Sequence, residues 1–481
     1  MNKIIKYIVL GLLPLMAGCQ DLFDNELPTY TVVKNAIYDA TSAENALRGI
    51  YSYLAPKSNQ HDFDTRMIKD GALRLGFYDI KRNTEKNLQQ LNVLDNATDC
   101  KSHWVAGSEI VNAANLVIDG VNNLEDGVLS PQKKKETLGE ALFMRAWAQL
   151  YLMKYFGWFW DVNSEYGPLM RRVPTTLQNV MQARSTVRES YEMILEDLNY
   201  AIGNAPDFSS PFRASKGLAK AYKVEVLLMR GEGSDLTDAI TLAGEVIKDY
   251  GFELEDSYKA VFDNGYKSKE LMFSRWISEV VATDADGDGG SMKRVFGGGE
   301  WPSDKYLQII ESDFNEGRQK VTMDSVFYEA TDSKKKVICW SKLWKEDGDC
   351  PMYYMRLAQM HLYRAEALFR TGAPLSEVLE ELNVLRRRAG CREFDVDALQ
   401  NYGSESIADL ILQEAVREIG MENGSEYYMA VRIPYRKGYP VLYIYNEYFN
   451  WEGLCYPIPQ DELKYNVLME QSPVVVPKDS K

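Results

Sequence analysis

The residue with the clearest capacity for covalent chemistry is Cys19, near the N-terminus. Lys3 and Lys6 place positive charge ahead of a short apolar run at 8–15, and Met16-Ala17-Gly18 precedes the cysteine. A basic start, an apolar run too short to span a bilayer and small residues before a cysteine form the pattern of a lipobox. This pattern predicts cleavage before Cys19 and attachment of a diacylglyceryl group to its sulfur. The alternative is an ordinary secretory signal with an accidental cysteine.

The predicted segments at this end are a lipoprotein signal peptide over 1–18 and an acidic lipidated tether over 19–30. Burial of acyl chains contributes roughly 0.8 kcal/mol per CH₂ group, so several chains on one residue form a stable anchor. No later segment reaches about 18 apolar residues without charge, which is the length that spans a bilayer. The lipid on Cys19 is therefore expected to be the attachment of the chain to a membrane.

Acidic residues suggest one metal site, and we expect no other cofactor. Asp284, Asp286 and Asp288 alternate with small residues as in the first half of a calcium-binding loop. The twelfth position of that loop is Val295 rather than glutamate, so the bidentate carboxylate is missing. A flexible acidic turn is the main interpretation of this segment, and calcium is the alternative.

The short motifs that mark common enzyme sites are absent from the sequence. It has no G-x-x-x-x-G-K-[ST] phosphate loop, no G-x-G-x-x-G after a strand, no G-x-S-x-G and no H-E-x-x-H. His61, His103 and His361 are far apart, and His361 lies in an apolar helical pattern that indicates packing. Pairs of carboxylates are uninformative in a chain with 70 acidic residues. We predict that the chain is not an enzyme.

Composition and cysteine content exclude further classes of function. The net charge of −15 argues against a nucleic acid as partner. A hydrophobic content of 45% is that of a folded globular protein. No pair of cysteines has the Cys-x-x-Cys spacing of a zinc site, and most are expected to be buried thiols. Cys339 and Cys350 are close enough in sequence to form a disulfide. The cysteines after Cys19 are Cys100, Cys339, Cys350, Cys391 and Cys455.

Helical periodicity supplies the elements that must position any functional residue. Apolar residues recur at three-to-four spacing over 353–370 and again over 375–389, which predicts a helical hairpin. The pair covers about 34 residues, the tetratricopeptide period. A second hairpin is predicted over 214–250, and a third, looser one from 136–156 and 186–203. Such hairpins bury their apolar faces against neighbours, so we expect a stacked helical scaffold.

Long stretches without this periodicity separate the hairpins. The two largest are predicted insertions at about 57–103 and 265–350, and residues 271–277 in the second are strand-like. Residues 157–185 and 433–458 are rich in aromatic residues and proline. Long loops in a folded domain often carry function, and these are too aromatic to be disordered.

Blocks of sequence in a fixed order cover nearly the whole chain after Cys19. They are Ala141-Leu142-Phe143-Met144-Arg145-Ala146 with Tyr155-Phe156-Gly157, Arg184-Ser185-Thr186-Val187, Arg213-Ala214-Ser215-Lys216-Gly217, Tyr354-Met355-Arg356-Leu357-Ala358, Leu382-Asn383-Val384-Leu385-Arg386, and Pro457-Ile458-Pro459-Gln460-Asp461-Glu462. With the lipobox, these blocks resemble the SusD/RagB family of nutrient-capture lipoproteins. The chain departs from the family at 422–426, where Glu-Gly-x-Arg is usual, and at Val467, where proline is usual.

The resemblance implies one SusD-like domain over 31–481 that is mainly α-helical. It would have a tetratricopeptide-like scaffold, with repeats at about 132–250 and 351–432, long irregular insertions and minor β content. Arg184 and Arg213 lie in these blocks, and two further blocks carry Arg364, in Arg364-Ala365-Glu366-Ala367, and Arg417, with Glu414, Glu418 and Glu422. We expect these arginines to pair with helix ends and buried acids rather than with a ligand.

The resemblance also implies a function. It predicts a lipoprotein of the outer membrane, facing the cell exterior, that binds a glycan and delivers it to a SusC-like TonB-dependent transporter. The alternative within the family is oligopeptide binding, as in the RagB branch. Two rivals lie outside it, namely a surface glycoside hydrolase and a structural lipoprotein without a ligand.

Ligand-binding residues follow no family motif, so the candidates rest on this sequence. Sugars present flat C–H faces between hydroxyl groups, which suits exposed aromatic rings flanked by polar groups. Trp147 lies in a helical stripe and is expected to be core, whereas rings in the insertions are better candidates. Trp301 follows three glycines and precedes Pro302, which favours display of its ring. The predicted ligand-binding residues are Phe77, Tyr78, Trp276, Trp301 and Trp340, with Asp62, Arg82 and Asn83 as hydrogen-bonding partners.

Overall fold

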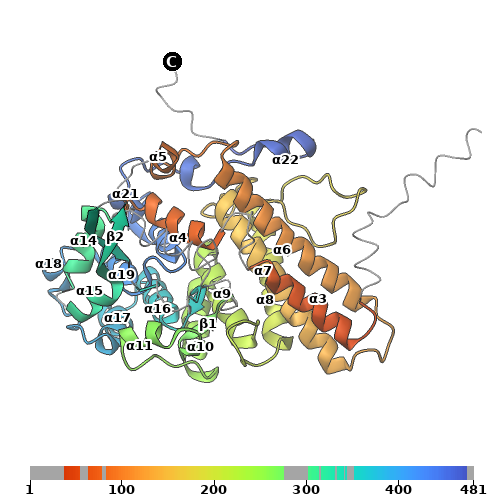
Figure 1. Cartoon of the computed structure of the whole chain (residues 1–481), viewed down its shortest axis with the longest axis horizontal. Coiled ribbons are helices and arrows are strands. Elements are labelled where there is room, and N and C mark those ends of the chain that lie inside the picture. The colour runs from red at the N-terminus through yellow and green to blue at the C-terminus, as the bar shows by residue number, and fades with distance from the viewer. Residues whose placement is uncertain are drawn as a thin grey trace, which may run out of the picture.

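The computed structural model describes residues 37–54, 63–78, 83–275, 302–313, 316–330, 333–340, 342–343 and 351–473. Within these residues the chain is mainly helical (Figure 1), as the sequence predicts. The helices are α3 (Ala40–Ser52), α4 (Phe63–Arg74), α5 (Asn83–Gln89), α6 (Thr98–Asn122), α7 (Pro131–Phe156), α8 (Val187–Asn204), α9 (Lys216–Arg230), α10 (Asp235–Asp249), α11 (Tyr258–Asp263), α14 (Asp304–Glu311), α15 (Glu316–Thr322), α16 (Ala358–Thr371), α17 (Leu375–Arg388), α18 (Ala398–Asn401), α19 (Ile407–Ile419), α20 (Ser425–Arg432), α21 (Leu442–Tyr445) and α22 (Gln460–Tyr465).

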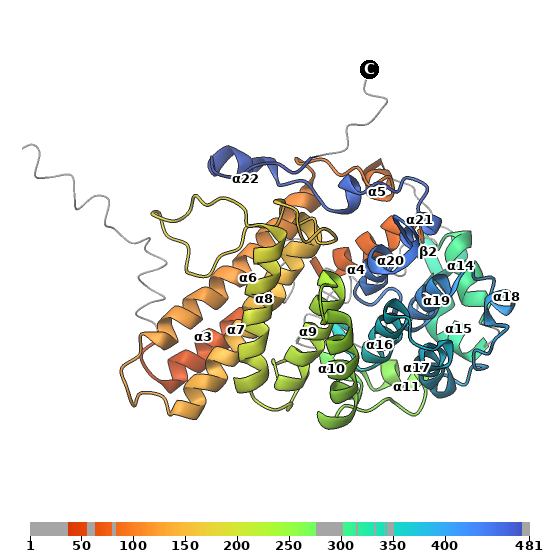
Figure 2. The same cartoon turned by 180° about the vertical axis from the view of Figure 1, so that it is seen from behind.

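The scaffold is a row of helices that pack in sequence order. Helix α6 packs on α7, α7 on α8, α8 on α9, α9 on α10, α10 on α16, and α16 on both α17 and α19. Figures 1 and 2 show this row running from α6 at one end of the molecule to α17 at the other. The three predicted hairpins are therefore confirmed as the pairs α7–α8, α9–α10 and α16–α17. Their likeness to tetratricopeptide repeats stays an interpretation.

Local signals set the ends of these helices. The Ser130 hydroxyl caps α7 by accepting from the amide of Lys133 at 3.2 Å, and Pro131 occupies the first turn, where a missing N–H costs nothing. Helices α9 and α16 end at Gly231 (φ +63°) and Gly372 (φ +73°), in the left-handed conformation that glycine adopts most easily.

Helix α7 lies at the centre of the core. Eighteen of its residues are buried, including Trp147, which is 5% exposed and thus a core residue as predicted. Gly139 allows the close approach of the chain after α8, because a Cβ at this position would lie 2.6 Å from the amide nitrogen of Ala205. Burial on all sides explains why this helix is so rich in apolar and aromatic residues.

The expectation of an irregular stretch over 57–103 is wrong for most of its described residues. Helices α4 and α5 and the start of α6 occupy this region, and α4 buries Ile68 and Ala72 completely. The 25-residue helix α6 was not predicted. Its buried side includes Ser102, His103 and Asn115, so its pattern lacks a clean apolar stripe.

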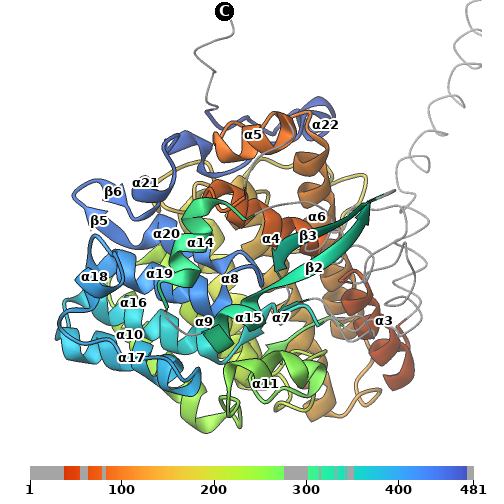
Figure 3. The ribbon, with the colours of Figure 1, turned by 60° about the vertical axis from the view of Figure 1, so that its left-hand side comes forward.

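Three two-stranded antiparallel sheets supply the minor β content. Strand β1 (Leu271–Phe273) confirms part of the strand-like segment and pairs with β4 (Met355–Arg356). Strands β2 (Met323–Ala330) and β3 (Ser333–Trp340) form a hairpin with Met323 opposite Trp340, seen as a long ribbon leaving α15 in Figure 3. Strand β5 (Pro434–Arg436) pairs with β6 (Tyr439–Pro440).

The N-terminal end of the described chain is packed onto the scaffold. A Cβ placed on Gly120 of α6 would lie 2.7 Å from the Cδ1 atom of Ile37, which shows how closely this residue seats against the helix. In the part of the chain that the structure describes, no helix is long and apolar enough to cross a membrane. The predicted lipidation site, Cys19, lies outside the described residues.

Candidate functional site

The two predicted insertions meet at one place, just beyond the end of α4. There the backbone of Tyr78 forms an antiparallel bridge with that of Pro302. The amide of Ser303 donates to the carbonyl oxygen of Phe77 at 2.8 Å, and its hydroxyl donates to the carbonyl oxygen of Gly76 at 2.8 Å. The same hydroxyl caps α14 by accepting from the amide of Tyr306 at 3.3 Å. We call this contact between the insertions the junction.

The core of the junction is aromatic. The ring of Phe77 meets the rings of Tyr306 and Tyr445 edge to face, with centroids 5.3 and 5.9 Å away. The ammonium group of Lys305 donates to the carbonyl oxygen of Tyr445, and burial lowers the pKa of that lysine. Helix α21, which carries Tyr445, is thereby fixed against α14.

The prediction that the rings of Phe77 and Tyr78 are displayed is wrong. Phe77 is 0% exposed and Tyr78 is 3% exposed, so neither ring is available for stacking on a ligand in this structure. The physical reason is that Tyr306 and Tyr445 cover Phe77 from segments far away in the sequence. These rings hold the junction together instead.

The other predicted ligand-binding residues lie in the same two insertions as the junction. Asn83 is the first residue of α5, and Trp340 is the last residue of β3. Trp301 directly precedes Pro302 in the sequence but lies outside the described residues. Also outside them are Asp62, Arg82, Trp276, the calcium candidates Asp284, Asp286 and Asp288, and Cys350. Their roles remain predictions.

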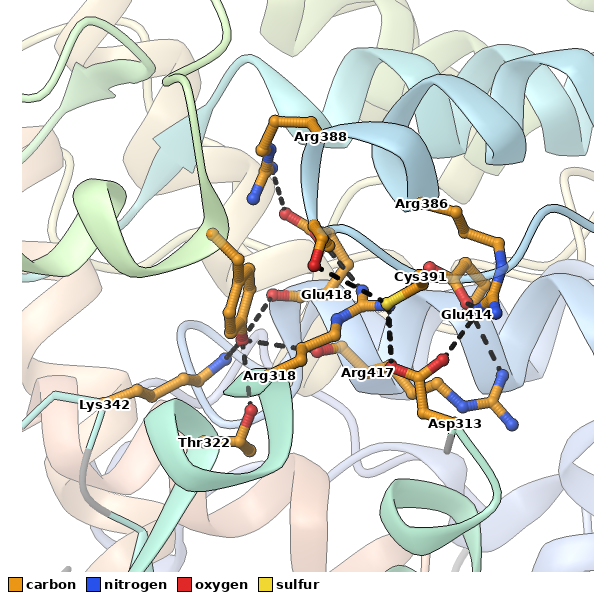
Figure 4. A network of polar contacts seen from close by, with 12 residues as sticks. Asp313, Arg318, Thr322, Lys342, Arg386, Arg388, Cys391, Glu414, Arg417 and Glu418 are labelled. Atoms are coloured by element: carbon orange, nitrogen blue, oxygen red, sulfur yellow. Dashed lines mark hydrogen bonds and ion pairs between the residues drawn. The ribbon is translucent and has the colours of Figure 1, made fainter. Parts of the chain in front are cut away.

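A buried ionic network ties the second insertion to the helical scaffold (Figure 4). Arg318 of α15 donates to Glu414 at 2.9 Å and to Glu418 at 3.0 Å, both on α19. Asp313, just after α14, accepts from Arg386 of α17 at 2.9 Å. Burial opposes the charge on Arg318, but the surrounding carboxylates raise the pKa of its guanidinium well above the usual value. Helices α14 and α15 are thus held by charge as well as by packing.

A second part of the network is centred on Arg356 and shares Glu418 with the first part. Arg356 of β4 is fully buried and donates to Glu270 at 2.9 Å, Glu418 at 2.7 Å and Glu422 at 2.7 Å. Lys342 donates to Glu422 at 2.9 Å. The facing cations hold the pKa of Glu418 below its usual range in spite of its burial. The network is enclosed and internally paired, which suits a structural role rather than contact with a ligand.

The four arginines expected to be structural are confirmed in that role. Each contacts a buried acid or a main-chain carbonyl group rather than an open surface. The partners are Glu44 and Glu140 for Arg213, Glu381 for Arg364, the carbonyl oxygens of Phe156 and Gly167 for Arg184, and the carbonyl oxygen of Ile309 for Arg417. His361 is 7% exposed and pairs with Glu381 at 2.9 Å, so it is packed as predicted.

Three of the described cysteines, not counting Cys339 of β3, are buried thiols, as expected. They are Cys100, Cys391 and Cys455. Burial raises the pKa of both Cys391 and Cys455 to about 12, which leaves the unreactive thiol form at neutral pH.

Sequence reasoning missed a buried polar group around His103. Its Nε2 atom lies 2.8 Å from Asp70, its Nδ1 atom bonds the hydroxyl of Tyr151, and its ring stacks on Tyr155. Tyr456 also donates to Asp70, at 2.6 Å. Burial lowers the pKa of His103, so the imidazole is neutral at physiological pH. The members come from distant segments, so no local pattern could have revealed the group.

A small cavity beside this group is lined by aromatic and charged side chains, among them Trp147, Tyr151, Lys154, Glu225 and Tyr428. It leaves about 30 Å³ for the centres of water molecules. One water needs roughly 10–15 Å³ by this measure, so the cavity suits a few ordered waters and not a sugar ring. Among the described residues, no three His, Cys, Asp or Glu side chains gather as metal ligands.

Two models of known protein families match separate parts of this chain. Residues 33–228 match a family model described as starch-binding and associating with the outer membrane, and residues 333–439 match the model of the SusD family. A SusD-like protein of Bacteroides ovatus is 25% identical over 279 residues, which are 55% of this chain. The match covers 48% of that relative, so it spans about half of its length.

Two solved structures are similar over nearly the whole chain. A SusD superfamily protein from Bacteroides thetaiotaomicron has a TM-score of 0.74 at 21% identity, covering 90% of this chain and all of that one. A putative sugar-binding protein from Bacteroides vulgatus has a TM-score of 0.70 at 20% identity, covering 92% of this chain and all of that one. At such identities the likeness establishes the fold.

Proposed function

The chain belongs to the SusD/RagB family, and on that premise we propose that it is a cell-surface protein that binds a glycan for uptake. The observation that carries the proposal is the match of residues 33–228 to a family model that is described as starch-binding and associating with the outer membrane. The family description names starch binding, and one similar structure is that of a putative sugar-binding protein. Both support a carbohydrate as the ligand.

The architecture suits a protein that presents a binding surface rather than one that rearranges. The scaffold helices pack in an unbroken row, and buried ion pairs clamp α14 and α15 onto α17 and α19. Insertions held in this way lose little conformational entropy when a ligand binds, so more of the contact energy appears as affinity. Binding without catalysis is the role that we assign to them.

Attachment and partner complete the proposal. A lipid on Cys19 would hold the protein at the outer membrane. Its partner would be a SusC-like TonB-dependent transporter, which receives the glycan that the chain has bound. The family description, which places its members in association with the outer membrane, supports this location.

The test of ligand class uses the mature chain purified from membranes in detergent. Binding to an array of plant, fungal, bacterial and animal oligosaccharides, with no new reducing ends after hours of incubation, is the expected result. Even a slow enzyme turns over about once per second, so hydrolysis would be visible. Release of reducing ends would make the protein a glycoside hydrolase. Binding of oligopeptides alone would overturn the glycan assignment.

The test of the partner is mild detergent extraction of outer membranes followed by affinity purification of the chain. Recovery of a TonB-dependent transporter with the chain is expected. Recovery of the chain alone under conditions that keep other outer-membrane complexes intact would contradict delivery to such a transporter.

A further inference from the structure

A second group of aromatic side chains lies on the surface in segments that were not among the predicted ligand-binding insertions. It is built from the loop after α7 and from the segment that begins with β6 and ends before α22. We call it the aromatic belt, and its members are Trp158, Trp160, Tyr439, Tyr443, Phe449 and Trp451. Tyr439 is 41% exposed and Tyr443 is 39% exposed, and the other four rings are partly buried against the core.

The tryptophans form one half of the belt. The ring of Trp160 lies 5.7 Å from that of Trp158 and 6.1 Å from that of Trp451, with interplanar angles of 24° and 31°. Trp158 and Trp160 are therefore stacked, and Trp451 is tilted relative to Trp160. Phe449 meets Trp451 edge to face at 5.1 Å and continues the row.

Tyrosines form the other half. Tyr443 lies 6.1 Å from Phe449 and 4.6 Å from Tyr439. The guanidinium of Arg436 lies 4.5 Å from the ring centre of Tyr443 and 4.8 Å from that of Tyr439. Contact with two rings positions this cation at the end of the row. The belt thus combines apolar ring surface with a hydrogen-bond donor.

The backbone holds the belt in place. The amide of Trp158 donates to the carbonyl oxygen of Tyr166 at 2.9 Å, which closes the first loop. The amide of Gly453 donates to the side chain of Asn450 at 2.7 Å, which fixes the turn after Trp451. The β5–β6 hairpin supports the tyrosine end, and Figure 3 shows it beside α21 at one edge of the molecule. Rings held in this way lose little entropy on binding.

The belt is separate from the junction, although α21 touches both. Side chains two positions apart on a helix point about 200° away from each other. Accordingly, Tyr445 is buried against Phe77 in the junction, whereas Tyr443 is exposed in the belt. Helix α21 therefore lies between the belt and the junction.

The chemistry of the belt fits a carbohydrate better than a protein. Every large apolar side chain that is exposed between residues 430 and 460 is a tyrosine. Exposed polar residues neighbour these rings in the sequence, including Asp161, Asn163, Glu447 and Glu452. Protein interfaces also bury aliphatic groups, and no large aliphatic side chain is exposed in the described residues 158–166 or 430–460.

We propose that the aromatic belt is a carbohydrate-binding surface, separate from the junction, on which an oligosaccharide lies across the contacting rings. The rings would cover the C–H faces of successive sugar units, and Arg436 and the rim residues would bond their hydroxyl groups. A row of six rings spans several sugar units, so a longer chain should bind more tightly than a disaccharide of the same sugar. This inference rests on the proposed glycan-binding function.

The experiment measures affinity by calorimetry for the oligosaccharide that the mature chain binds most strongly on the array. The variants are Trp160→Ala and Tyr443→Ala, and the control is Tyr465→Ala, a tyrosine of α22 that is 68% exposed and outside the belt. By analogy with stacking of nucleic-acid bases, loss of one ring should weaken binding roughly 5- to 150-fold. The control should bind like the parent. Circular dichroism establishes that each variant is folded.

The outcomes distinguish a failure of the proposed glycan-binding function from a failure of the belt as a binding surface. If the parent binds no glycan, the proposed function fails and the inference fails with it. If the parent binds, while folded Tyr443→Ala and Trp160→Ala both bind as the parent does, the belt is not a binding surface and only the inference is overturned. Should Trp160→Ala not fold, Tyr443→Ala alone decides, because its exposed ring can be removed without opening the core.

Discussion

The main-chain amide of Ser303 donates a hydrogen bond of 2.8 Å to the carbonyl oxygen of Phe77, and this bond joins the two insertions of the chain. The hydroxyl of the same serine donates to Gly76 and caps α14. One small side chain therefore couples the end of α4 to the start of α14. Any ligand surface built from both insertions depends on this coupling.

Ser303→Ala should weaken both the fold and glycan binding. Loss of a helix cap costs about 1 kcal/mol, and the carbonyl group of Gly76 loses its hydroxyl partner. Urea unfolding should show a decrease of that size in the free energy of unfolding. Glycan affinity, measured by calorimetry at a temperature where the variant is folded, should fall because the insertions lose the side-chain hydrogen bond between them and keep only their main-chain contacts.

The matched control is Ser257→Ala, since Ser257 caps α11 by accepting from Ala260 at 3.2 Å. It should lose a similar free energy of unfolding and bind glycan like the parent. Equal binding by both variants would place the ligand away from the junction.

Arg356→Met should destabilise the protein strongly. The substitution leaves Glu270, Glu418 and Glu422 buried without the cation that they share, and breaking a buried ion pair in this way costs about 3–5 kcal/mol. Urea unfolding followed by circular dichroism measures the change. Arg392→Ala is the control, because Arg392 pairs with Asp395 on the surface and should change stability by less than about 1 kcal/mol. Similar losses in the two variants would show that the network contributes little.

Glu426→Gln should reduce the dependence of stability on pH. Burial raises the pKa of Glu426 from 4.5 to about 7, although the amide of Met421 donates to its carboxylate. The folded state therefore binds this proton more tightly than the unfolded state does. The resulting stabilisation is complete below pH 4.5 and is lost as the pH rises through about 7. It amounts to at most about 3–4 kcal/mol, at 1.4 kcal/mol per pKa unit.

The measurement is urea unfolding of parent and variant at pH 5 and pH 8. The parent should lose more stability than Glu426→Gln over this interval, because glutamine cannot ionise. Glu125→Gln, which removes an exposed glutamate, should behave like the parent. A parent and a Glu426→Gln variant with the same change would show that Glu426 titrates normally.

Cys19→Ala should release the protein from the membrane. The predicted lipid has only the cysteine sulfur as its attachment point, and no described helix could replace it as an anchor. Metabolic labelling with a fatty acid should give no signal, and fractionation should move the chain to soluble fractions. Ser52→Ala, a change far from the lipobox, should leave both unchanged. Full membrane retention of the cysteine variant would refute the lipoprotein assignment.

The sequence by itself determined the helices whose signals are local. The hairpins α9–α10 and α16–α17 follow from apolar spacing and from Gly231 and Gly372, because a turn of helix involves only residues three or four apart. Ordered blocks of sequence likewise indicated the family. Helix α6 was not predicted from the sequence because His103 and other polar residues lie on its buried side.

Tertiary structure alone decided which aromatic residues are surface and which are core. Phe77 is buried because Tyr306 and Tyr445 come from distant segments to cover it, and a loop position gave no sign of them. The aromatic belt exists because Trp160 comes to lie beside Trp451. Periodicity reports which way a residue faces within its own element, whereas exposure depends on which other elements pack above it.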